Sequence, residues 1–348
     1  MYIYVLIFTD KILKFNTMKE FIHFVSDEQR CIDFVREVRW NGNVTCAYCK
    51  HEKVYELKGV NKRFKCAQCK RQFSVIKGTI FENSPIPLSK WLEAIYYLVS
   101  RKRGISSPQL SKEIGVTIKT AWFMLGRIRL MLMKNINRAK LSGYVEADET
   151  YIGGKNKNRH PDKKAKGAGG RSCKDKAPVV GIISPEEYEY IERPHKTNPA
   201  RIVRDKIITK PAVLICKATS SVRKEVLQPF IKQNVELGAI LVTDEYQAYK
   251  GLAGLYEHQV VVHRLNEYVN DQGFTTNRIE NAWTHLKATV MGNYRMVSRK
   301  HLHRYLDEYC FRFNHRHYDL DKDNLMLRSF ENLERRLTWK QLVRKSSA

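Results

Sequence analysis

The sequence predicts an α/β protein in which a mixed sheet, flanked by helices, follows a small metal-binding module and a helical region. In the second half of the chain, short β-branched and apolar runs alternate with stretches of helical periodicity, a pattern typical of strands crossed by helices. Upstream, four cysteines in two CxxC pairs predict the metal-binding module. Between Pro87 and Arg138 the apolar residues recur at helical spacing, which predicts a helical region.

These changes of pattern divide the 348 residues into five expected parts. We expect the metal-binding module with a short helical lead at 18–84, the helical region at 85–140, the α/β domain at 141–318 and a charged tail at 319–348. Residues 1–17 begin with an apolar run that is too short to span a bilayer and that lacks a positive leader. We interpret them as a non-native extension, with translation starting at Met18.

The composition points to a polyanionic partner. Lys and Arg number 62 against 36 Asp and Glu, a net charge of +26, and phosphate neutralisation with counterion release supplies most non-specific DNA affinity. An acidic protein or a membrane surface is the alternative, but no basic amphipathic helix adjoins a lipidation motif. Half of the eight cysteines form the two pairs, which suits a reducing cytosol and one metal site. We therefore expect a cytoplasmic, nucleoid-associated protein.

The paired cysteines have the spacing of a zinc ribbon. Cys46 and Cys49 are followed, after sixteen residues, by Cys66 and Cys69, a spacing that closes a tetrahedral thiolate site on two knuckles. Alternating residues between and after the pairs predict short strands. Four cysteine ligands leave no open position, so we expect one structural Zn²⁺. Whether the ribbon contacts DNA or only folds the N-terminal region is left open by the sequence.

Within the helical region, the stretch 105–122 has the signals of a helix, a tight turn and a second helix. Ser107 can cap the first helix with Pro108 at its first position, Gly115 permits the turn, and Thr117 can cap the second helix. This arrangement predicts a helix-turn-helix.

The second helix of that motif would be the recognition element. Its first turn carries Thr117, Lys119 and Thr120, which can reach base edges or phosphates. The alternative is a helical hairpin used for packing or dimerisation. The charge of the chain favours DNA binding.

A basic segment follows the first strand of the α/β domain. Residues 155–176 contain nine Lys or Arg and two Asp, and too few apolar residues to pack alone. We expect a loop that lies along DNA phosphates, with Lys155, Lys163 and Lys164 among its contacts. A solvated surface loop without a ligand is the alternative.

Three acids in the α/β domain are candidate metal ligands. Asp148 and Asp244 each lie at or near the end of an apolar run that predicts a buried strand, and Glu280 opens a helical stretch. Two strand carboxylates and one helix carboxylate suit Mg²⁺, which prefers oxygen ligands, and two such ions promote phosphodiester hydrolysis or transfer. Glu280, Trp283 and Lys287 share one helix face, so Lys287 would place a cation near phosphate. Taken singly, a strand-end Asp is more often a turn former or helix cap.

In order along the chain, these motifs resemble a known family. The segments 143–155, 238–249 and 276–287, followed by the tail 292–316, resemble the Asp-Asp-Glu transposases of bacterial insertion sequences, specifically the group related to the eukaryotic Merlin elements. The resemblance implies a ribonuclease-H-like domain in which Asp148, Asp244 and Glu280 hold two Mg²⁺ (or Mn²⁺) ions.

Supporting roles follow from the same resemblance. His263 matches a position that is often histidine in the family, where it would steady phosphate or metal, although a structural role at a strand end fits as well. Asn277 would help to orient phosphate. The chain departs from the family at position 275, where the family often has histidine and this sequence has Thr275.

Three further acids flank the proposed ligands. Alternation along a strand puts Glu146 on the same face as Asp148, so Glu146 can assist a metal ion. The same rule predicts that Glu149 and Glu245 face away or cap a turn.

The function that the resemblance implies is transposition. Such a protein binds the terminal inverted repeats of its element, cleaves the strand and joins the 3′-hydroxyl to target DNA, working on double-stranded DNA as a homodimer or higher oligomer. One alternative is a nuclease that hydrolyses without strand transfer. Another is a DNA-binding regulator with a zinc ribbon, a helix-turn-helix and an inactive α/β domain. The course and role of residues 185–210 are not assigned.

Overall fold

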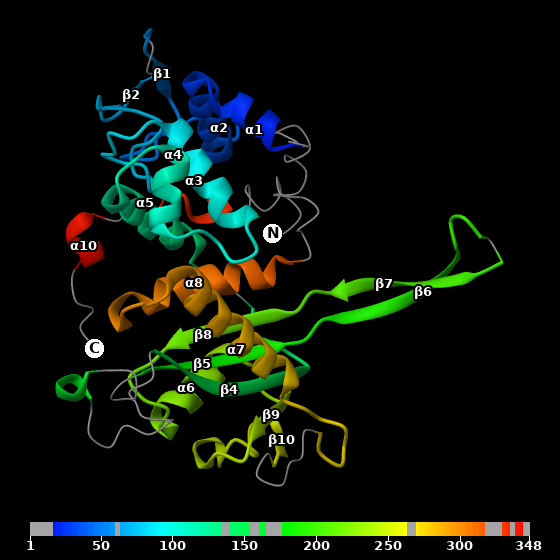
Figure 1. The fold of residues 1–348 in the computed structure, drawn as a ribbon. Coiled ribbons are helices and arrows are strands. Elements are labelled where there is room, and N and C mark those ends of the chain that lie inside the picture. The colour runs from blue at the N-terminus through cyan, green and yellow to red at the C-terminus, as the bar shows by residue number, and fades with distance from the viewer. Residues whose placement is uncertain are drawn as a thin grey trace. The chain divides into compact units, whose positions relative to one another are not determined.

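The structure is a computed structural model of the chain (Figure 1). It describes residues 17–59, 63–133, 139–153, 160–164, 176–198, 200–262, 269–316, 329–334 and 338–343. These residues form two compact units. The first comprises residues 1–134 and 318–346, and the second comprises residues 135–317 with the last two of the chain. Residues 1–16 of the expected extension lie outside the described part.

Helices make up most of the first unit. Their bounds are α1 Met18–Val25, α2 Glu28–Trp40, α3 Leu88–Ser100, α4 Ser107–Ile114, α5 Ile118–Leu132, the 3₁₀ turn η8 Phe330–Asn332 and α10 Trp339–Val343. The side chains of Thr17 and Asp27 cap α1 and α2 by accepting backbone N–H groups. The helices predicted before Trp40 and after Pro87 are therefore confirmed.

A small three-stranded sheet follows α2. It contains β1 Val54–Glu56, β2 Phe64–Cys66 and β3 Gln72–Phe73, paired antiparallel in that order. Trp40 at the end of α2 packs edge-on against Phe64, with 5.6 Å between ring centroids, and Phe64 stacks on Phe73 at 5.5 Å. These rings give the sheet an apolar anchor on α2, which a sheet of two or three short strands needs.

The expected helix, turn and helix are present at 107–132, with one correction. Ser106, not Ser107, is the cap of α4, because its hydroxyl accepts the N–H of Gln109; Ser107 and Pro108 occupy the first turn. Gly115 takes a left-handed conformation (φ 62°), and Thr117 caps α5 through the N–H of Thr120 at 3.1 Å. Local capping signals therefore set the shape of this segment.

The described C-terminal segments, residues 329–334 and 338–343, pack inside the first unit. Phe330 is buried and meets Phe34 of α2 edge-on at 5.5 Å between centroids. Leu342 is buried against Gly126 of α5, where a β-carbon would lie 2.8 Å from the leucine side chain. The described parts of the charged C-terminal segment thus contribute apolar anchors to the N-terminal core.

The second unit is built on a five-stranded mixed sheet in the order β10-β9-β4-β5-β8. Its strands are β4 Tyr144–Ile152, β5 Ala177–Ser184, β8 Val213–Ala218, β9 Ile240–Asp244 and β10 Glu257–Val261. The neighbouring strands β4, β5 and β8 pair antiparallel, whereas β9 lies parallel to β4 and β10 lies parallel to β9. The strands predicted around Asp148 and before Asp244 are confirmed, but Asp148 lies in the middle of its strand and not at the end.

Helices cover both faces of this sheet (Figure 1). They are α6 Lys224–Asn234, α7 Asn277–Thr289, the π-turn η6 Val290–Tyr294 and α8 Arg299–Asn314, with the short turns η3 Pro161–Lys163 and η4 Gln247–Tyr249 in loops. One core joins α6 to side chains such as Val145 and Ile182. The other core joins α7 and α8 to Val179 and Ile183. The prediction of a mixed sheet flanked by helices is confirmed.

A long hairpin separates β5 from β8. It consists of β6 Glu187–Pro194 and β7 Ile202–Lys210, an antiparallel pair that makes its own two-stranded sheet. The hairpin continues outward from β5 and β8, beyond the five-stranded sheet (Figure 1). Among the described helices of the chain, none combines the length and apolar character needed to cross a membrane.

Candidate active site and metal centres

Strand register brings Asp148 and Asp244 together. The parallel pair of β4 and β9 matches Val145 with Leu241 and Glu146 with Val242. Continuing this register by two residues places Asp148 level with Asp244 on the neighbouring strand and on the same face. The two predicted ligands meet because β9 returns parallel to β4, a fact of topology that spacing along the chain does not give.

A third acid, Glu149, joins them. One ligand atom from each of Asp148, Glu149 and Asp244 lies within 4.8 Å of the others; we call these three residues the acidic group. Glu149 also accepts a hydrogen bond from the buried hydroxyl of Tyr249 at 2.9 Å. The prediction that Glu149 faces away from the ligands is therefore wrong, because its long side chain brings a carboxylate oxygen back to Asp148. Glu245 is exposed, as expected.

Asp148 has an unusual protonation equilibrium. Burial, together with the negative charges of Glu149 and Asp244, raises the pKa of Asp148 to about 7, against opposing hydrogen bonds from the Glu149 backbone and the Trp283 indole. Crowded carboxylates with a raised pKa are a signature of metal and catalytic sites, because a cation relieves the repulsion. The acidic group can hold a divalent cation with little movement, since Mg²⁺ takes oxygen ligands at about 2.0–2.1 Å.

Trp283 connects α7 to this group. Its Nε1–H donates to Asp148 Oδ2 at 2.9 Å. The indole lies over Gly181 of β5, where a β-carbon would come within 2.3 Å of the ring. Gly181 stands directly opposite Asp148 in the antiparallel pair, so the missing side chain makes the room for the indole. A glycine inside an apolar strand is the signal that could have indicated this close approach.

Glu280 lies in the first turn of α7, one turn before Trp283. It is half-buried and accepts a hydrogen bond from the hydroxyl of Thr276 at 3.1 Å. The spacing of Glu280 and Trp283 places both on one helix face, and Trp283 reaches Asp148. Among the described residues, however, the acidic group does not include Glu280.

Glu146 holds the start of α7. Its carboxylate is fully buried, and Oε2 accepts the backbone N–H groups of Arg278 and Ile279, each at 3.0 Å. Oε1 accepts from the Arg278 guanidinium at 3.2 Å and from the Tyr144 hydroxyl at 3.3 Å. The prediction that Glu146 assists a metal ion is not supported: it shares the sheet face of Asp148, but its oxygens satisfy the orphan donors of a helix N-terminus.

The expected supporting residues have different outcomes. Asn277 and Lys287 are exposed on α7. Thr275, which replaces the expected histidine, accepts the N–H of Asn277 on its hydroxyl at 3.1 Å and the hydroxyl of Tyr144 on its carbonyl at 2.6 Å. Thr275 thus helps to begin the helix. His263 lies outside the described residues.

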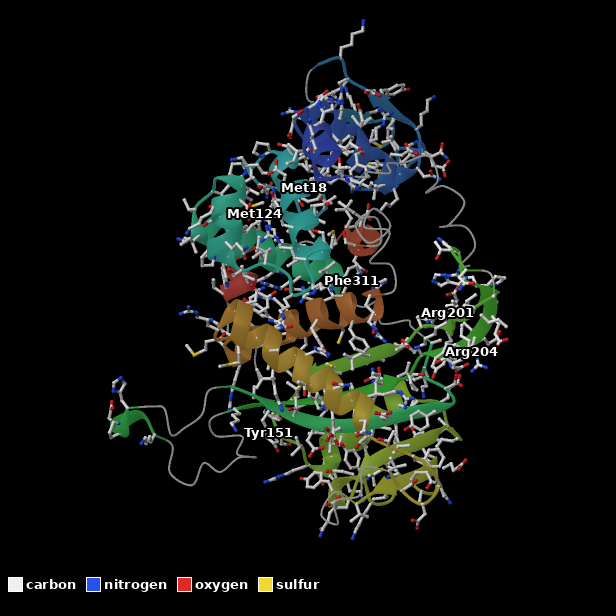
Figure 2. All side chains as sticks on the ribbon, turned by 45° about the vertical axis from the view of Figure 1, so that its right-hand side comes forward. Met18, Met124, Tyr151, Arg201, Arg204 and Phe311 are labelled. Carbon is white, nitrogen blue, oxygen red and sulfur yellow. The ribbon has the colours of Figure 1, made fainter. Side chains whose placement is uncertain are left out.

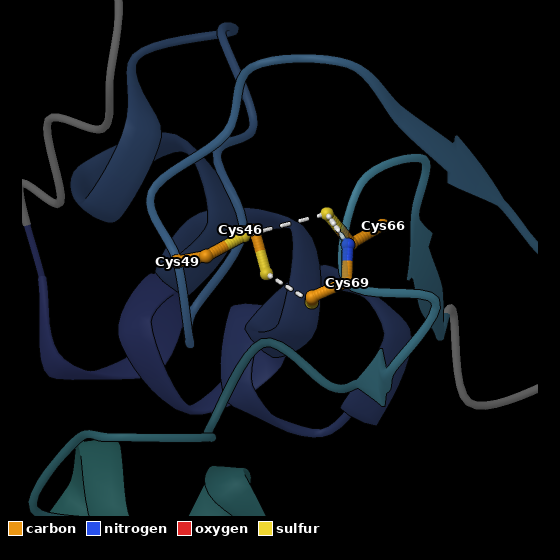
Figure 3. A group of neighbouring side chains, drawn as sticks. All are labelled: Cys46, Cys49, Cys66 and Cys69. Atoms are coloured by element: carbon orange, nitrogen blue, oxygen red, sulfur yellow. Dashed lines mark hydrogen bonds between the residues drawn. The ribbon is translucent and has the colours of Figure 1, made fainter.

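The four paired cysteines converge as expected (Figure 3). Cys46 Sγ lies 3.6 Å from Cys69 Sγ, Cys49 Sγ lies 3.6 Å from Cys66 Sγ, and all four sulfurs fall within 4.8 Å of one another. Tetrahedral Zn²⁺ with sulfur at about 2.3 Å requires sulfurs nearly this far apart. The cluster therefore fits a structural Zn²⁺.

Backbone donors support this cluster. The N–H groups of Gln68 and Cys69 point at Cys66 Sγ at 3.3 and 3.5 Å. Burial acts to raise the pKa of the Cys66 thiol, but these donors, together with Cys49 and Cys69, outweigh it and lower the pKa to about 6. The knuckle thus favours the thiolate that a metal ion needs.

The predicted DNA contacts are only partly described. Thr117 and Thr120 bond to each other through their hydroxyls at 2.9 Å, and the Lys119 ammonium lies 5.2 Å from the Trp339 ring centroid. Lys164 is exposed. The backbone of Lys163 belongs to η3, but its side chain and the whole of Lys155 lie outside the described residues.

Comparisons with known proteins identify the family of the chain. No solved structure matches the chain. A protein in the transposable element ISH50 of Halobacterium salinarum is 29% identical over 257 residues, which cover 71% of this chain and 78% of that protein. A transposase zinc-ribbon domain matches residues 26–72, and an ISXO2-like transposase domain matches residues 140–314. Because the second match runs from before β4 to the end of α8 and includes the acidic group, the chain belongs to the family of transposases with an ISXO2-like transposase domain.

Proposed function

We propose that the protein is a metal-dependent DNA transposase that binds the terminal inverted repeats of an insertion sequence, cleaves DNA and transfers the 3′-hydroxyl end to target DNA. The observation that carries this proposal is the convergence of Asp148 and Asp244 on adjacent parallel strands, beneath the helix that carries Glu280. Family membership supports DNA as the substrate class. The net charge of +26 suits that substrate.

The metal would be held by Asp148, Asp244 and Glu280. Two Mg²⁺ or Mn²⁺ ions there would activate the attacking oxygen and stabilise the leaving oxygen. The chain's own residues prepare the site: Trp283 fixes one carboxylate oxygen of Asp148 by hydrogen bonding, and Glu146 fixes the start of α7. Glu149 is a further ligand candidate from its place in the acidic group.

We infer a ribonuclease-H-like architecture for the second unit. In support, the antiparallel strands β4, β5 and β8, with the β6–β7 hairpin inserted before β8, are followed along the chain by β9 and β10, which lie on the other side of β4 and parallel to it. Counted along the chain, Asp148 then lies on the first strand of the sheet (β4), Asp244 on the fourth (β9), and Glu280 on the helix that follows the fifth (β10).

The remaining parts would bind DNA. We propose that α4 and α5 act as a helix-turn-helix, supported by the left-handed Gly115 between them and by the exposed first turn of α5. Lys287 and Asn277 on α7 are exposed and available to phosphate. We expect the protein to act in the cytoplasm, as a homodimer or higher oligomer on the nucleoid.

The decisive experiment is strand transfer of a labelled, pre-cleaved terminal-repeat end into plasmid DNA with Mg²⁺. The wild-type protein should give joined product, and Asp244→Ala should give none. Glu257→Ala, at an exposed acid on β10, is the matched control and should retain activity. Cleavage without joining would identify a nuclease. Binding without either reaction, with Mg²⁺ or Mn²⁺, would identify a DNA-binding regulator.

A further inference from the structure

The hairpin of β6 and β7 has no role in the chemistry proposed above. Within the described residues its two strands pair only with each other, and Arg201 and Arg204 lie on it beyond the five-stranded sheet (Figure 2). At its base, Glu186 forms an ion pair at 2.9 Å with Arg316, which lies two residues beyond the end of α8. We call residues 186–210 the arm.

Both faces of the arm carry exposed apolar side chains. Directly opposed residues of an antiparallel pair point to the same face, so the register assigns Tyr188, Tyr190 and Ile202 to one face, which we call the tyrosine face. Tyr190 is 59% exposed and Ile202 is 65% exposed. The opposite face, which we call the isoleucine face, carries Ile191 and Ile207, which are also exposed.

An arm of this kind needs a partner. An isolated two-stranded ribbon is at best marginally stable in water, and its unpaired edges invite association. On the tyrosine face the Tyr188 and Tyr190 rings meet edge-on, with 5.4 Å between centroids. Aromatic side chains are enriched at the centres of protein interfaces. The tyrosine face therefore has the composition of a contact surface.

The charges of the arm argue against DNA as that partner. Residues 186–210 contain six Lys or Arg and five Asp or Glu, a net charge of +1 in a chain with a net charge of +26. Four of the six cations also form ion pairs within the arm, one of them being Lys206 with Glu186. Arg204 bonds Glu192 at 2.8 Å, Lys210 bonds Glu187 at 2.6 Å, and Arg193 bonds Asp205. Phosphate binding would have to displace these carboxylates, whereas a second arm brings carboxylates of its own, so that each cation keeps an acidic neighbour.

The charges are instead divided between the two strands. β6 has three Glu and one Arg, a net charge of −2, whereas β7 has three Lys or Arg and one Asp, a net charge of +2. A second arm can therefore lie on the first with its acidic strand over the basic strand. A twofold axis along the arm produces this arrangement twice and buries both tyrosine faces.

We propose that the arm is a self-association surface, in which the tyrosine face of β6 and β7 packs on the same face of a second copy of this chain. The contact is small, because eight residues of strand extend only about 26 Å, whereas a standard interface buries roughly 800 Å² on each partner. The arm alone should give weak association, which binding of both copies to one DNA would strengthen. The proposal is independent of catalysis.

The test is sedimentation of the full-length protein, without DNA or Mg²⁺, over a concentration series reaching roughly 100 µM. The wild type should dimerise. The double variant Tyr188→Thr, Tyr190→Thr should have a dimer dissociation constant at least tenfold higher. The matched control Ile191→Thr, Ile207→Thr removes apolar area from the isoleucine face and should dimerise as the wild type does. Replacing residues 187–210 by two glycines should give a monomer whose sheet remains folded.

Reversed charges test the arrangement of the strands. Arg204→Glu with Lys206→Glu, and separately Glu187→Lys with Glu192→Lys, should each lose self-association, and an equimolar mixture of the two should recover a mixed dimer. Failure of the mixture to associate overturns the proposed arrangement. A monomeric wild type, or equal loss in the variants of the two faces, overturns the proposal. Weaker binding of a short duplex by the tyrosine variant, with unchanged self-association, would assign the arm to DNA.

Discussion

Asp148 and Gly181 stand directly opposite each other in the β4–β5 pair, and the space above Gly181 holds the indole that hydrogen-bonds Asp148. The smallest side chain in the sheet thus decides where α7 rests. Because Glu280 lies on α7 one turn before this indole, the same contact sets the distance between the helix carboxylate and the strand carboxylates.

Gly181→Ala should disturb both stability and catalysis. The new methyl group would overlap the Trp283 ring, because a β-carbon at this position would lie 2.3 Å from a ring that its bond to Asp148 holds in place. Overpacking of this kind costs about 1–3 kcal/mol of unfolding free energy, and we expect at least a tenfold loss of strand transfer. Thermal unfolding and the strand-transfer assay measure the two effects. Gly254→Ala, where the β-carbon meets open space, is the control; equal behaviour of the two variants would refute the packing argument.

Glu146→Gln should weaken the second unit without removing a metal ligand. The amide oxygen can keep the two backbone donors of α7, but the amide NH₂ would face the donors Tyr144 and Arg278. We expect a loss of about 1–3 kcal/mol. The increase in melting temperature on adding Mg²⁺ should persist. A variant of wild-type stability that no longer responds to Mg²⁺ would instead make Glu146 a ligand.

Without a divalent cation in the acidic group, the free energy of unfolding should fall as pH rises from about 4 to about 7, because Asp148 loses its proton over this range. Burial and the charges of Glu149 and Asp244 raise the pKa of Asp148 to about 7, so the folded state holds this proton more tightly than the unfolded state, and deprotonation destabilises the fold. Each unit by which the pKa differs between the folded and unfolded states corresponds to about 1.4 kcal/mol of unfolding free energy. Asp148→Asn should remove this part of the pH dependence, measured from the unfolding transition of the second unit without added Mg²⁺ at several pH values. Asp271→Asn, at an exposed aspartate, should not.

Zinc should be stoichiometric and structural. We expect one Zn²⁺ per chain by elemental analysis. The variant Cys66→Ser should lose that ion, because it removes the sulfur that accepts two backbone N–H groups in the cluster. The first unit should then lose its ribbon, while the second unit keeps its unfolding transition. Cys216→Ala, on β8 and outside the cluster, should retain zinc. Full zinc content in the Cys66 variant would contradict the assignment.

The C-terminal segment should stabilise the first unit. Phe330→Ala removes a buried ring that meets Phe34 and Phe81, and such truncations cost about 3–5 kcal/mol. Val343→Ala, at a partly exposed position on α10, should cost little. Thermal unfolding compares them. A Phe330 variant with wild-type stability would show that the segment only rests on the surface.

The sequence by itself determined the elements with local signals. The CxxC spacing predicted a cluster that four nearby sulfurs bear out, and Gly115 and Thr117 placed a turn and a cap because glycine conformation and hydroxyl capping act within a few residues. Apolar periodicity likewise predicted the strands that carry Asp148 and Asp244.

Only the tertiary structure decided what those elements do to one another. Because β9 lies parallel to β4, Asp244 is level with Asp148. Strand alternation predicted that Glu149 faces away from them, but its long side chain places a carboxylate oxygen beside both. Glu146 became a helix cap because the start of α7 lies over it, and the charged tail became part of a core because Phe330 and Leu342 find partners far away in sequence. Such contacts depend on which strand and helix become neighbours, and spacing along the chain does not encode that choice locally.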